Sequence, residues 1–390
     1  MKKDKQKKED PYSKMTIDEL TALAEQGDRL AQNDVGICYL IGDGVEKDLQ
    51  KAVEWLTKSA EQEYDFAQFN LALCYLDGEG VKQDLKQAAK LFAKAAEQGH
   101  KWSQANLGTC YEYGDGVRQN DTKAVEWFLK AAEQGVAKAQ YKLALHYEIG
   151  SGVERNLEKA FEWYYKAAEQ GHAEAQYALA TFYEMGEIVN EDHVKAVEWY
   201  KKSANQGFAD AQYNLAICYE EGTGVKKNNV KAVELYNKAA EQGVILAWNN
   251  LGFHYEKGLG VKKDQTKAFE YYQKGAELGD AVAQFSLGLC YHFGRCVDEN
   301  PEQAVHWYME AASKGMSKAQ NNLGTCYQDG YGVEKDLIKA AEWFAQAAKQ
   351  GDKEAQKNLN DLKLSQEYFN LRYTNYSPRH KGSSDPDCPF

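Results

Sequence analysis

The sequence repeats itself with a period of 36 residues. The dipeptide Ala-Gln begins at positions 31, 67, 139, 175, 211, 283, 319 and 355, and the two remaining slots hold Ser103-Gln104 and Ala247-Trp248. Ten copies therefore keep a single phase over most of the 390 residues. A fixed period of this length is the signature of a repeat architecture, in which each copy is one supersecondary unit.

Each copy predicts two amphipathic helices joined by a glycine-rich break. In the first copy, apolar and small residues recur at helical spacing over 35–39 and again over 52–60, and Gly42-Asp43-Gly44-Val45 separates the two runs. The residue that opens the second helix is Asp or Asn in all nine complete copies, as an N-cap requires: Asp48, Asp84, Asn120, Asn156, Asp192, Asn228, Asp264, Asn300 and Asp336. Because one helix pair cannot bury its apolar face alone, the copies must stack. The sequence predicts an all-α protein, a right-handed α-solenoid of about ten helix-turn-helix repeats of 36 residues.

The ends of the array predict caps and tails. Thr16-Ile17-Asp18-Glu19 has the form of a capping box and opens a lone second helix, while 355–364 resembles a lone first helix. We therefore predict a solenoid over 16–364, with nine full repeats from 31 to 354 between two half-repeat caps. We expect a disordered basic tail over 1–15 and a largely disordered extension over 365–390.

Composition excludes several classes of protein. The formal net charge of -12 argues against duplex nucleic acid as the partner, because phosphate binding needs a basic surface. No uninterrupted apolar run approaches 18 residues, and no apolar stretch follows the basic start. We expect neither a membrane span nor a secretory signal, and a cytoplasmic location.

The repeat resembles the Sel1-like repeat family, a relative of the tetratricopeptide repeats. The resemblance covers about residues 17 to 364, and the third copy carries its motif in full: Leu107-Gly108, Tyr111, Gly114-Asp115-Gly116-Val117, Lys123-Ala124, Trp127-Phe128, Lys130-Ala131-Ala132 and Gly135. Such proteins look like scaffolds and adaptors that bind other proteins, and the resemblance implies that role here. Two copies depart from the pattern, since Ile188 and Cys296 replace the second loop glycine. A β-branched residue at positive φ would be strained, so we expect a reshaped loop at Ile188.

Nothing in the sequence indicates an enzyme or a metal site. Six cysteines share one repeat column: Cys38, Cys74, Cys110, Cys218, Cys290 and Cys326. Equivalent positions in stacked units lie roughly 10 Å apart, too far for a disulfide or for shared zinc ligands. We expect reduced, packed thiols, no metal and no cofactor. No serine nucleophile motif or phosphate loop is present either, so we expect no catalysis.

One stripe of the first helix varies between copies and is the candidate binding surface. In tetratricopeptide arrays, which the chain resembles, the corresponding stripe lines a concave ligand groove. One of its columns holds aromatic residues and another holds acidic ones: Phe69, Tyr141, Tyr177, Tyr213 and Phe285, with Glu112, Glu148, Glu184, Glu220 and Glu256. We hypothesise an acidic, aromatic-lined groove that holds a Lys- or Arg-containing peptide or protein; the alternative is a solvated surface of an acidic protein. Trp248 stands where the other nine copies have Gln, and marks either a contact site or local repacking.

Two further functions stay open at this stage. Some bacterial relatives look like β-lactam binders or weak β-lactamases, so the resemblance also admits a small-molecule or hydrolytic activity. A host-directed bacterial effector is the other alternative, and it would still be a binding protein.

Overall fold

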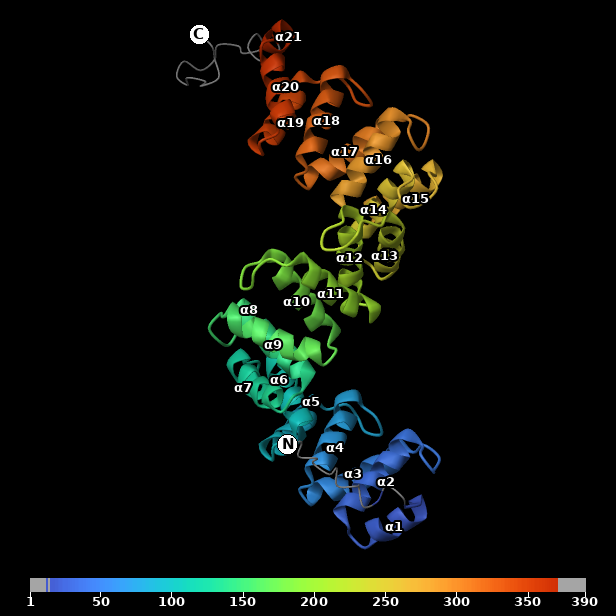
Figure 1. Ribbon diagram of the computed structural model, residues 1–390, viewed down its shortest axis with the longest axis vertical. Helices are drawn as coiled ribbons and strands as arrows, with labels where there is room; N and C mark the ends of the chain where they lie inside the picture. Colours follow the sequence, from blue (N-terminus) through green and yellow to red (C-terminus); the bar gives the residue numbers. More distant parts are fainter. Residues whose placement is uncertain (1–11, 13–14, 371–390) are drawn as a thin grey trace. The chain divides into compact units, whose positions relative to one another are not determined.

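The computed structural model describes residues 12 and 15–370, and every regular element in this part of the chain is a helix (Figure 1). The chain divides into two compact units, with the boundary between Ser203 and Ala204. Unit 1 holds these helices: α1 (Ile17–Glu25), α2 (Arg29–Ile41), α3 (Leu49–Glu61), α4 (Asp65–Asp77), α5 (Leu85–Glu97), α6 (Lys101–Tyr113), α7 (Asp121–Glu133), α8 (Ala137–Ile149), α9 (Leu157–Glu169), α10 (Ala173–Met185) and most of α11 (His193–Asn205).

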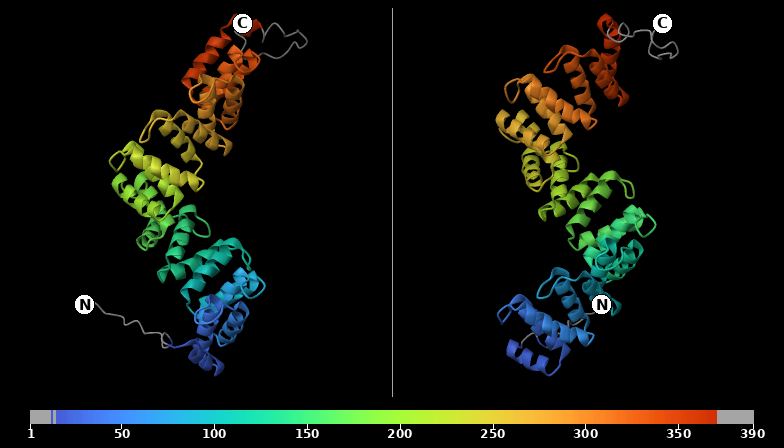
Figure 2. Two further views of the ribbon diagram at one scale, coloured as in Figure 1. Left: turned by 90° about the vertical axis from the view of Figure 1, so that its right-hand side faces the viewer. Right: turned by 180° about the vertical axis from the view of Figure 1, so that it is seen from behind.

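Unit 2 continues the same alternation of first and second helices. It holds α12 (Ala209–Glu221), α13 (Asn229–Glu241), α14 (Leu246–Lys257), α15 (Gln265–Glu277), α16 (Ala281–Phe293), α17 (Pro301–Ser313), α18 (Ser317–Asp329), α19 (Leu337–Lys349), α20 (Lys353–Lys363) and α21 (Gln366–Phe369). Within each unit, consecutive helices pack side by side, as the two further views show (Figure 2). The predicted all-α repeat architecture is confirmed, and each unit is a stack of helix pairs.

The ends of the helices follow from the repeated residues. The Asp or Asn that precedes each second helix accepts a hydrogen bond from the backbone N–H three residues later, in all nine copies. Each first helix of these copies ends at a glycine in the left-handed conformation, from Gly42 to Gly330. The N-cap prediction is confirmed in every copy.

The second loop glycine sets the spacing between neighbouring repeats. Gly116 has φ +71°, and a Cβ atom built on it would lie 2.0 Å from the carbonyl oxygen of Leu85, in the preceding repeat. Among the described non-glycine residues, Glu63 alone has positive φ, so Ile188 and Cys296 do not adopt the glycine conformation. The reshaped loop that the sequence predicts at Ile188 is therefore confirmed.

The glutamine that nine of the ten copies share tethers one helix to the next. The Gln104 side-chain amide donates to the carbonyl of Ala96 at 3.1 Å, and its oxygen accepts from Gln134 at 2.8 Å. Gln32, Gln140 and Gln320 form both equivalent bonds. Buried polar groups require such partners, which explains why the column keeps its identity.

The described ends extend slightly past the predicted caps. Thr16 and Glu19 form the predicted capping box at α1, and Tyr12 donates to Asp28 at 3.0 Å. At the other end, α21 follows α20, and Tyr368 is buried. The other residues of the predicted tails, 1–11, 13–14 and 371–390, lie outside the described residues.

Candidate functional site

The predicted aromatic column lies half buried against the second helix of the same repeat. Each ring packs on a buried ring of that helix, with centroids 5.7 to 6.0 Å apart: Phe69 on Phe92, Tyr141 on Tyr164, Tyr177 on Tyr200, Tyr213 on Tyr236, and Phe285 on Tyr308. These rings therefore contribute to the packing of each repeat. Phe69 and Tyr141 also contact His100 and His172, with ring centroids 4.9 and 4.7 Å apart.

Four of the five predicted glutamates have a partner inside their own repeat. A buried tyrosine hydroxyl of the second helix donates to each carboxylate at 2.5 to 2.8 Å: Tyr164 to Glu148, Tyr200 to Glu184, Tyr236 to Glu220, and Tyr272 to Glu256. Such a hydrogen bond to a charged acceptor fixes the position of the carboxylate. The glutamates thus have a structural role, whatever else they bind.

The pairing can be recognised in the sequence only by comparing two repeat columns, because the residue types at the glutamate position and at the tyrosine position change together. Where the second helix has Leu56 or Phe92, the first helix has Leu40 or Leu76; the four tyrosines named above face glutamates. A buried phenol needs an acceptor and a buried phenyl ring does not, which explains the correlation. In copy eight His292 stands in place of the glutamate, and its Nδ1 atom lies 3.2 Å from the hydroxyl of Tyr308.

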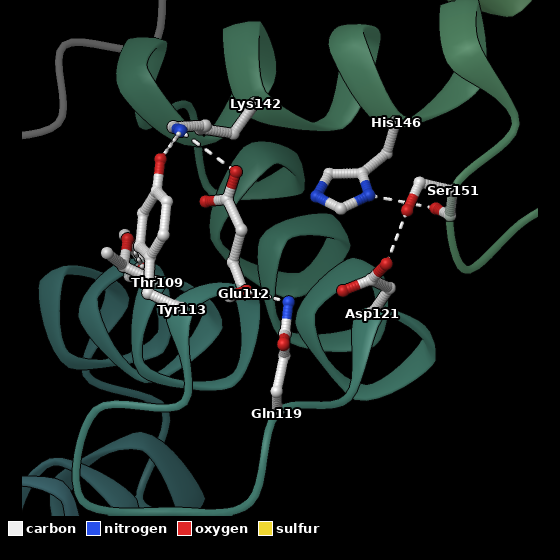
Figure 3. A network of polar contacts seen from close by, with 9 residues as sticks. Thr109, Glu112, Tyr113, Gln119, Asp121, Lys142, His146 and Ser151 are labelled. Atoms are coloured by element: carbon white, nitrogen blue, oxygen red, sulfur yellow. Dashed lines mark hydrogen bonds and ion pairs between the residues drawn. The ribbon is translucent and has the colours of Figure 1, made fainter.

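Glu112 departs from this pattern because Phe128 occupies the tyrosine position. Its carboxylate instead lies 3.0 Å from the Lys142 ammonium group, which also donates to the hydroxyl of Tyr113 at 2.9 Å (Figure 3). Both ionic side chains are mostly buried. Lys142 therefore neutralises Glu112, which interrupts the predicted ladder of negative charge.

Two histidines replace the column cysteine and face the preceding repeat. His146 Nδ1 donates to the carbonyl oxygen of Ser151 at 2.8 Å, while the Ser151 hydroxyl donates to Asp121 at 2.5 Å (Figure 3). The serine hydroxyl and the imidazole thus have different partners, unlike a nucleophile and its general base.

The second histidine lies close to a carboxylate in unit 2. His254 Nδ1 bonds to the carbonyl oxygen of Leu259, and Nε2 lies 3.3 Å from a carboxylate oxygen of Glu220. The contact with His254 holds the pKa of Glu220 below its usual value. Glu256 is also paired, with Lys257 at 2.7 Å.

Trp248 is accommodated by a change elsewhere in its own repeat. Its ring stacks on Tyr271 with centroids 5.7 Å apart, and the Lys274 ammonium lies 4.9 Å from the ring centroid. A Cβ atom on Gly275 would lie 2.7 Å from the Cβ of Ala283 and 3.2 Å from the Cβ of Trp248, and the other copies have Ala or Ser at that position. These contacts support local repacking, which the paired changes at 248 and 275 indicate in the sequence as well.

None of the cysteines of the shared column forms a disulfide in the described structure. Cys38 is half buried and the other five are buried. Burial raises the pKa of Cys74 and of Cys110 to about 11. The described residues contain no group of three His, Cys, Asp or Glu side chains that could hold a metal ion. Within the same part of the chain, no helix is both long enough and apolar enough to cross a membrane.

The most exposed apolar side chains of the first helices lie in unit 1. Tyr113, Ile149 and Met185 end three successive first helices and expose 59%, 68% and 67% of their surface. A recess of about 110 Å³ is lined by residues that include Glu148, Thr181 and Met185. This column directly follows the acidic one, and it is not among the residues predicted from the sequence.

The buried tyrosines predict loss of stability at alkaline pH. Burial and the neighbouring carboxylates raise the pKa values of Tyr164, Tyr236 and Tyr272 in the folded protein. The phenols of the unfolded chain ionise near pH 10. Their contribution to the free energy of unfolding is therefore complete below about pH 10, and it is lost as the pH rises through the pKa values of the folded protein. Tyrosinate absorbance should therefore rise together with the loss of helical circular dichroism. Ionisation of all phenols near pH 10 with the helices intact would contradict this prediction.

The stacked helix pairs define a helical repeat protein, a class of fold that typically mediates protein–protein interaction. The chain belongs to the Sel1 repeat family: the family model described as "Sel1 repeat" matches residues 29–64, 65–100, 103–136, 137–172, 173–208, 209–244, 247–280, 281–316 and 317–352. This family is generally non-catalytic.

Two solved structures resemble the chain over most of its length. A protective antigen of uropathogenic Escherichia coli with an SLR fold is 36% identical, with a TM-score of 0.74, over 89% of this chain and 82% of that one. A Sel1 repeat protein from Oxalobacter formigenes is 32% identical, with a TM-score of 0.60, over 84% of this chain and 93% of that one. None of the curated proteins compared with the chain matches it.

Proposed function

We propose that the protein is a non-catalytic scaffold or adaptor that binds a peptide segment of another protein on the first helices of unit 1. The observation that carries this proposal is the recess of about 110 Å³ beside Glu148, with Met185 exposed at its edge. Its lining combines the apolar side chains of Leu157, Phe182 and Met185 with the carboxylates of Glu148 and Glu187 and with Arg155. Because the two carboxylates outnumber the one cation, this lining fits a segment with an apolar side chain near Lys or Arg.

The charges favour unit 1 over unit 2 for this role. Glu220 and Glu256 lie beside His254 and Lys257, whereas Glu148 and Glu184 form no ion pair in the described structure. A carboxylate offers about four lone-pair sites, and the tyrosine hydroxyl occupies one of them. The bond to tyrosine therefore orients each carboxylate and leaves acceptor sites for a cationic partner.

The proposal narrows the predicted set of binding residues. Glu148, Glu184, Phe69, Tyr141 and Tyr177 remain candidates because they share unit 1 with the recess. Glu112 contributes little net charge because Lys142 pairs with it. No observation in the described residues favours the β-lactam-binding or the effector alternative.

The charge of Glu148 and Glu184 is expected to set the affinity for a cationic peptide. The double variant E148Q/E184Q keeps an acceptor for each tyrosine and removes both charges. Peptides selected from a displayed random library on the full chain should bind it about tenfold more weakly, which corresponds to about 1.4 kcal/mol. Their affinity should also depend less on salt.

The matched control is E220Q/E256Q, which makes the same change in unit 2. Fluorescence polarisation with labelled peptides compares both variants with the wild-type chain. Equal affinity of E148Q/E184Q and the wild type, at low and at raised salt, would remove the cationic partner from the proposal.

A further inference from the structure

The aromatic column is interrupted at one repeat of unit 1. Five copies place a Phe or Tyr over the ring of the second helix, as described above. Three others have an asparagine, and each of these accepts a hydrogen bond from the next first helix: Asn33 from Asn70, Asn249 from Ser286, and Asn321 from Asn358. The third copy has Ala105, whose methyl group does neither.

A recess lies where the missing ring would be. It has a volume of about 40 Å³ and is lined by residues that include Trp102, Ala105 and Thr109 of α6, Phe128 of α7, and Val136 and Lys138 at the start of α8. One water needs roughly 10–15 Å³ of such space, so the recess accepts the edge of a side chain but not a whole ring. The remainder of that side chain would lie outside, against Trp102.

The floor of the recess is apolar, and the uncharged polar side chains at its rim donate their hydrogen bonds to carbonyl groups within α6. Phe128 and Val136 are buried. The Thr109 hydroxyl donates to the carbonyl of Ala105 at 3.1 Å, and the Asn106 amide donates to that of Trp102 at 2.8 Å. Because these donors are used within α6, the recess favours an apolar group over a polar one.

The wall residue Trp102 is unusually exposed for its type. It keeps 46% of its surface accessible, and tryptophan is one of the residue types enriched in interface hot spots. The Lys101 ammonium lies 5.4 Å from the ring centroid of Trp102, and the exposed Lys138 lines the recess. Neither lysine forms an ion pair in the described structure, so this site carries unpaired positive charge. Glu148 and Glu184, by contrast, carry negative charge.

We propose that the recess at Ala105 binds one aromatic side chain of the partner peptide, with an Asp or Glu adjacent to it. The edge of the aromatic ring enters the recess against Phe128, and the remainder of the ring lies outside, against Trp102. The neighbouring carboxylate pairs with Lys101 or Lys138. This inference rests on the proposed peptide-binding function and adds a second specificity element in the same unit.

The test fills the recess with the residue that the other copies already have. Random peptides displayed on phage are selected on the full chain, and their affinities are measured for the wild type and for A105F. We expect the selected sequences to carry an aromatic residue beside Asp or Glu, and A105F to bind them at least about tenfold more weakly. The thermal midpoint of A105F should be equal to or above that of the wild type, because its ring packs on Phe128.

Three further variants make the result specific. Ala105→Ser keeps the recess open and should retain affinity. Trp102→Ala removes the exposed wall, and should weaken binding even if the buried substitution at 105 disturbs folding. Lys138→Glu should weaken binding of peptides with an acidic residue and spare those in which that residue is Gln.

The outcomes separate this inference from the proposed function. Peptides that bind A105F and W102A as well as the wild type, but lose affinity for E148Q/E184Q, would overturn the recess and leave the adaptor role intact. Peptides indifferent to all of these variants, or no enriched peptide at all, would overturn both.

Discussion

Replacing Gly116 by alanine is expected to destabilise the protein by about 3 kcal/mol. Two costs add. The residue has φ +71°, where a Cβ atom costs roughly 1–2 kcal/mol. The new atom would also lie 2.0 Å from the backbone oxygen of Leu85, which has no side-chain rotation available to relieve the overlap. The repeat must then move away from its neighbour or rebuild its loop.

Gly135 supplies the control because it shares the backbone conformation but not the contact. Its φ is +84°, and a Cβ atom added there would meet no other atom within 4 Å. Gly135→Ala should cost only the conformational term, about 1–2 kcal/mol. Denaturant unfolding gives the free energies, and hydrogen exchange of α5 and α7 locates the loss, since repeat arrays can unfold in parts. Equal stabilities of the two variants would show that the loop at 116 rearranges freely, as it does at Ile188.

Replacing Glu148 by alanine is expected to cost about 2 kcal/mol of stability before any partner is involved. The variant deprives the hydroxyl of Tyr164 of its acceptor at 2.5 Å, and this tyrosine is almost fully buried. Hydrogen bonds to a charged group contribute about 1.5–3 kcal/mol. Glu148→Gln keeps an acceptor and should cost less than about 1 kcal/mol.

A double-mutant cycle isolates this interaction. Tyr164→Phe removes the donor and leaves the ring in place, so E148A in the Y164F background should cost much less than E148A alone. We expect a coupling free energy of about 1.5 kcal/mol from chemical denaturation of the four proteins. A coupling near zero would mean that water serves the tyrosine equally well. The carboxylate would then be free of structural constraint.

The local features of the fold were predictable because they depend on short-range chemistry. The Asp or Asn at each N-cap and the glycine at each first-helix end have the same local role in every copy, so their columns are invariant. The loop change at Ile188 was predictable for the same reason. A β-branched residue does not adopt positive φ, and the structure confirms this.

The candidate site was predicted only in outline. The acidic column was identified from helical spacing, but its tyrosine partners lie 16 residues away and Lys142 lies 30 residues from Glu112. A single column presents each glutamate as charge available to a ligand, whereas contacts between columns show which carboxylates have partners. The exposed stripe of Tyr113, Ile149 and Met185 was missed because the same column holds charged residues in other copies.

The sequence by itself determined the repeat length, the two helices of each copy, their caps and the family, because each of these depends on residues close together in the chain. Only the tertiary structure decided which side chains remain available to a partner. Availability depends on what the next helix and the next repeat place opposite each residue: a tyrosine hydroxyl at Glu148, an ammonium group at Glu112, and no ring at Ala105. Those contacts arise from stacking, which brings residues 16 to 30 positions apart within bonding distance.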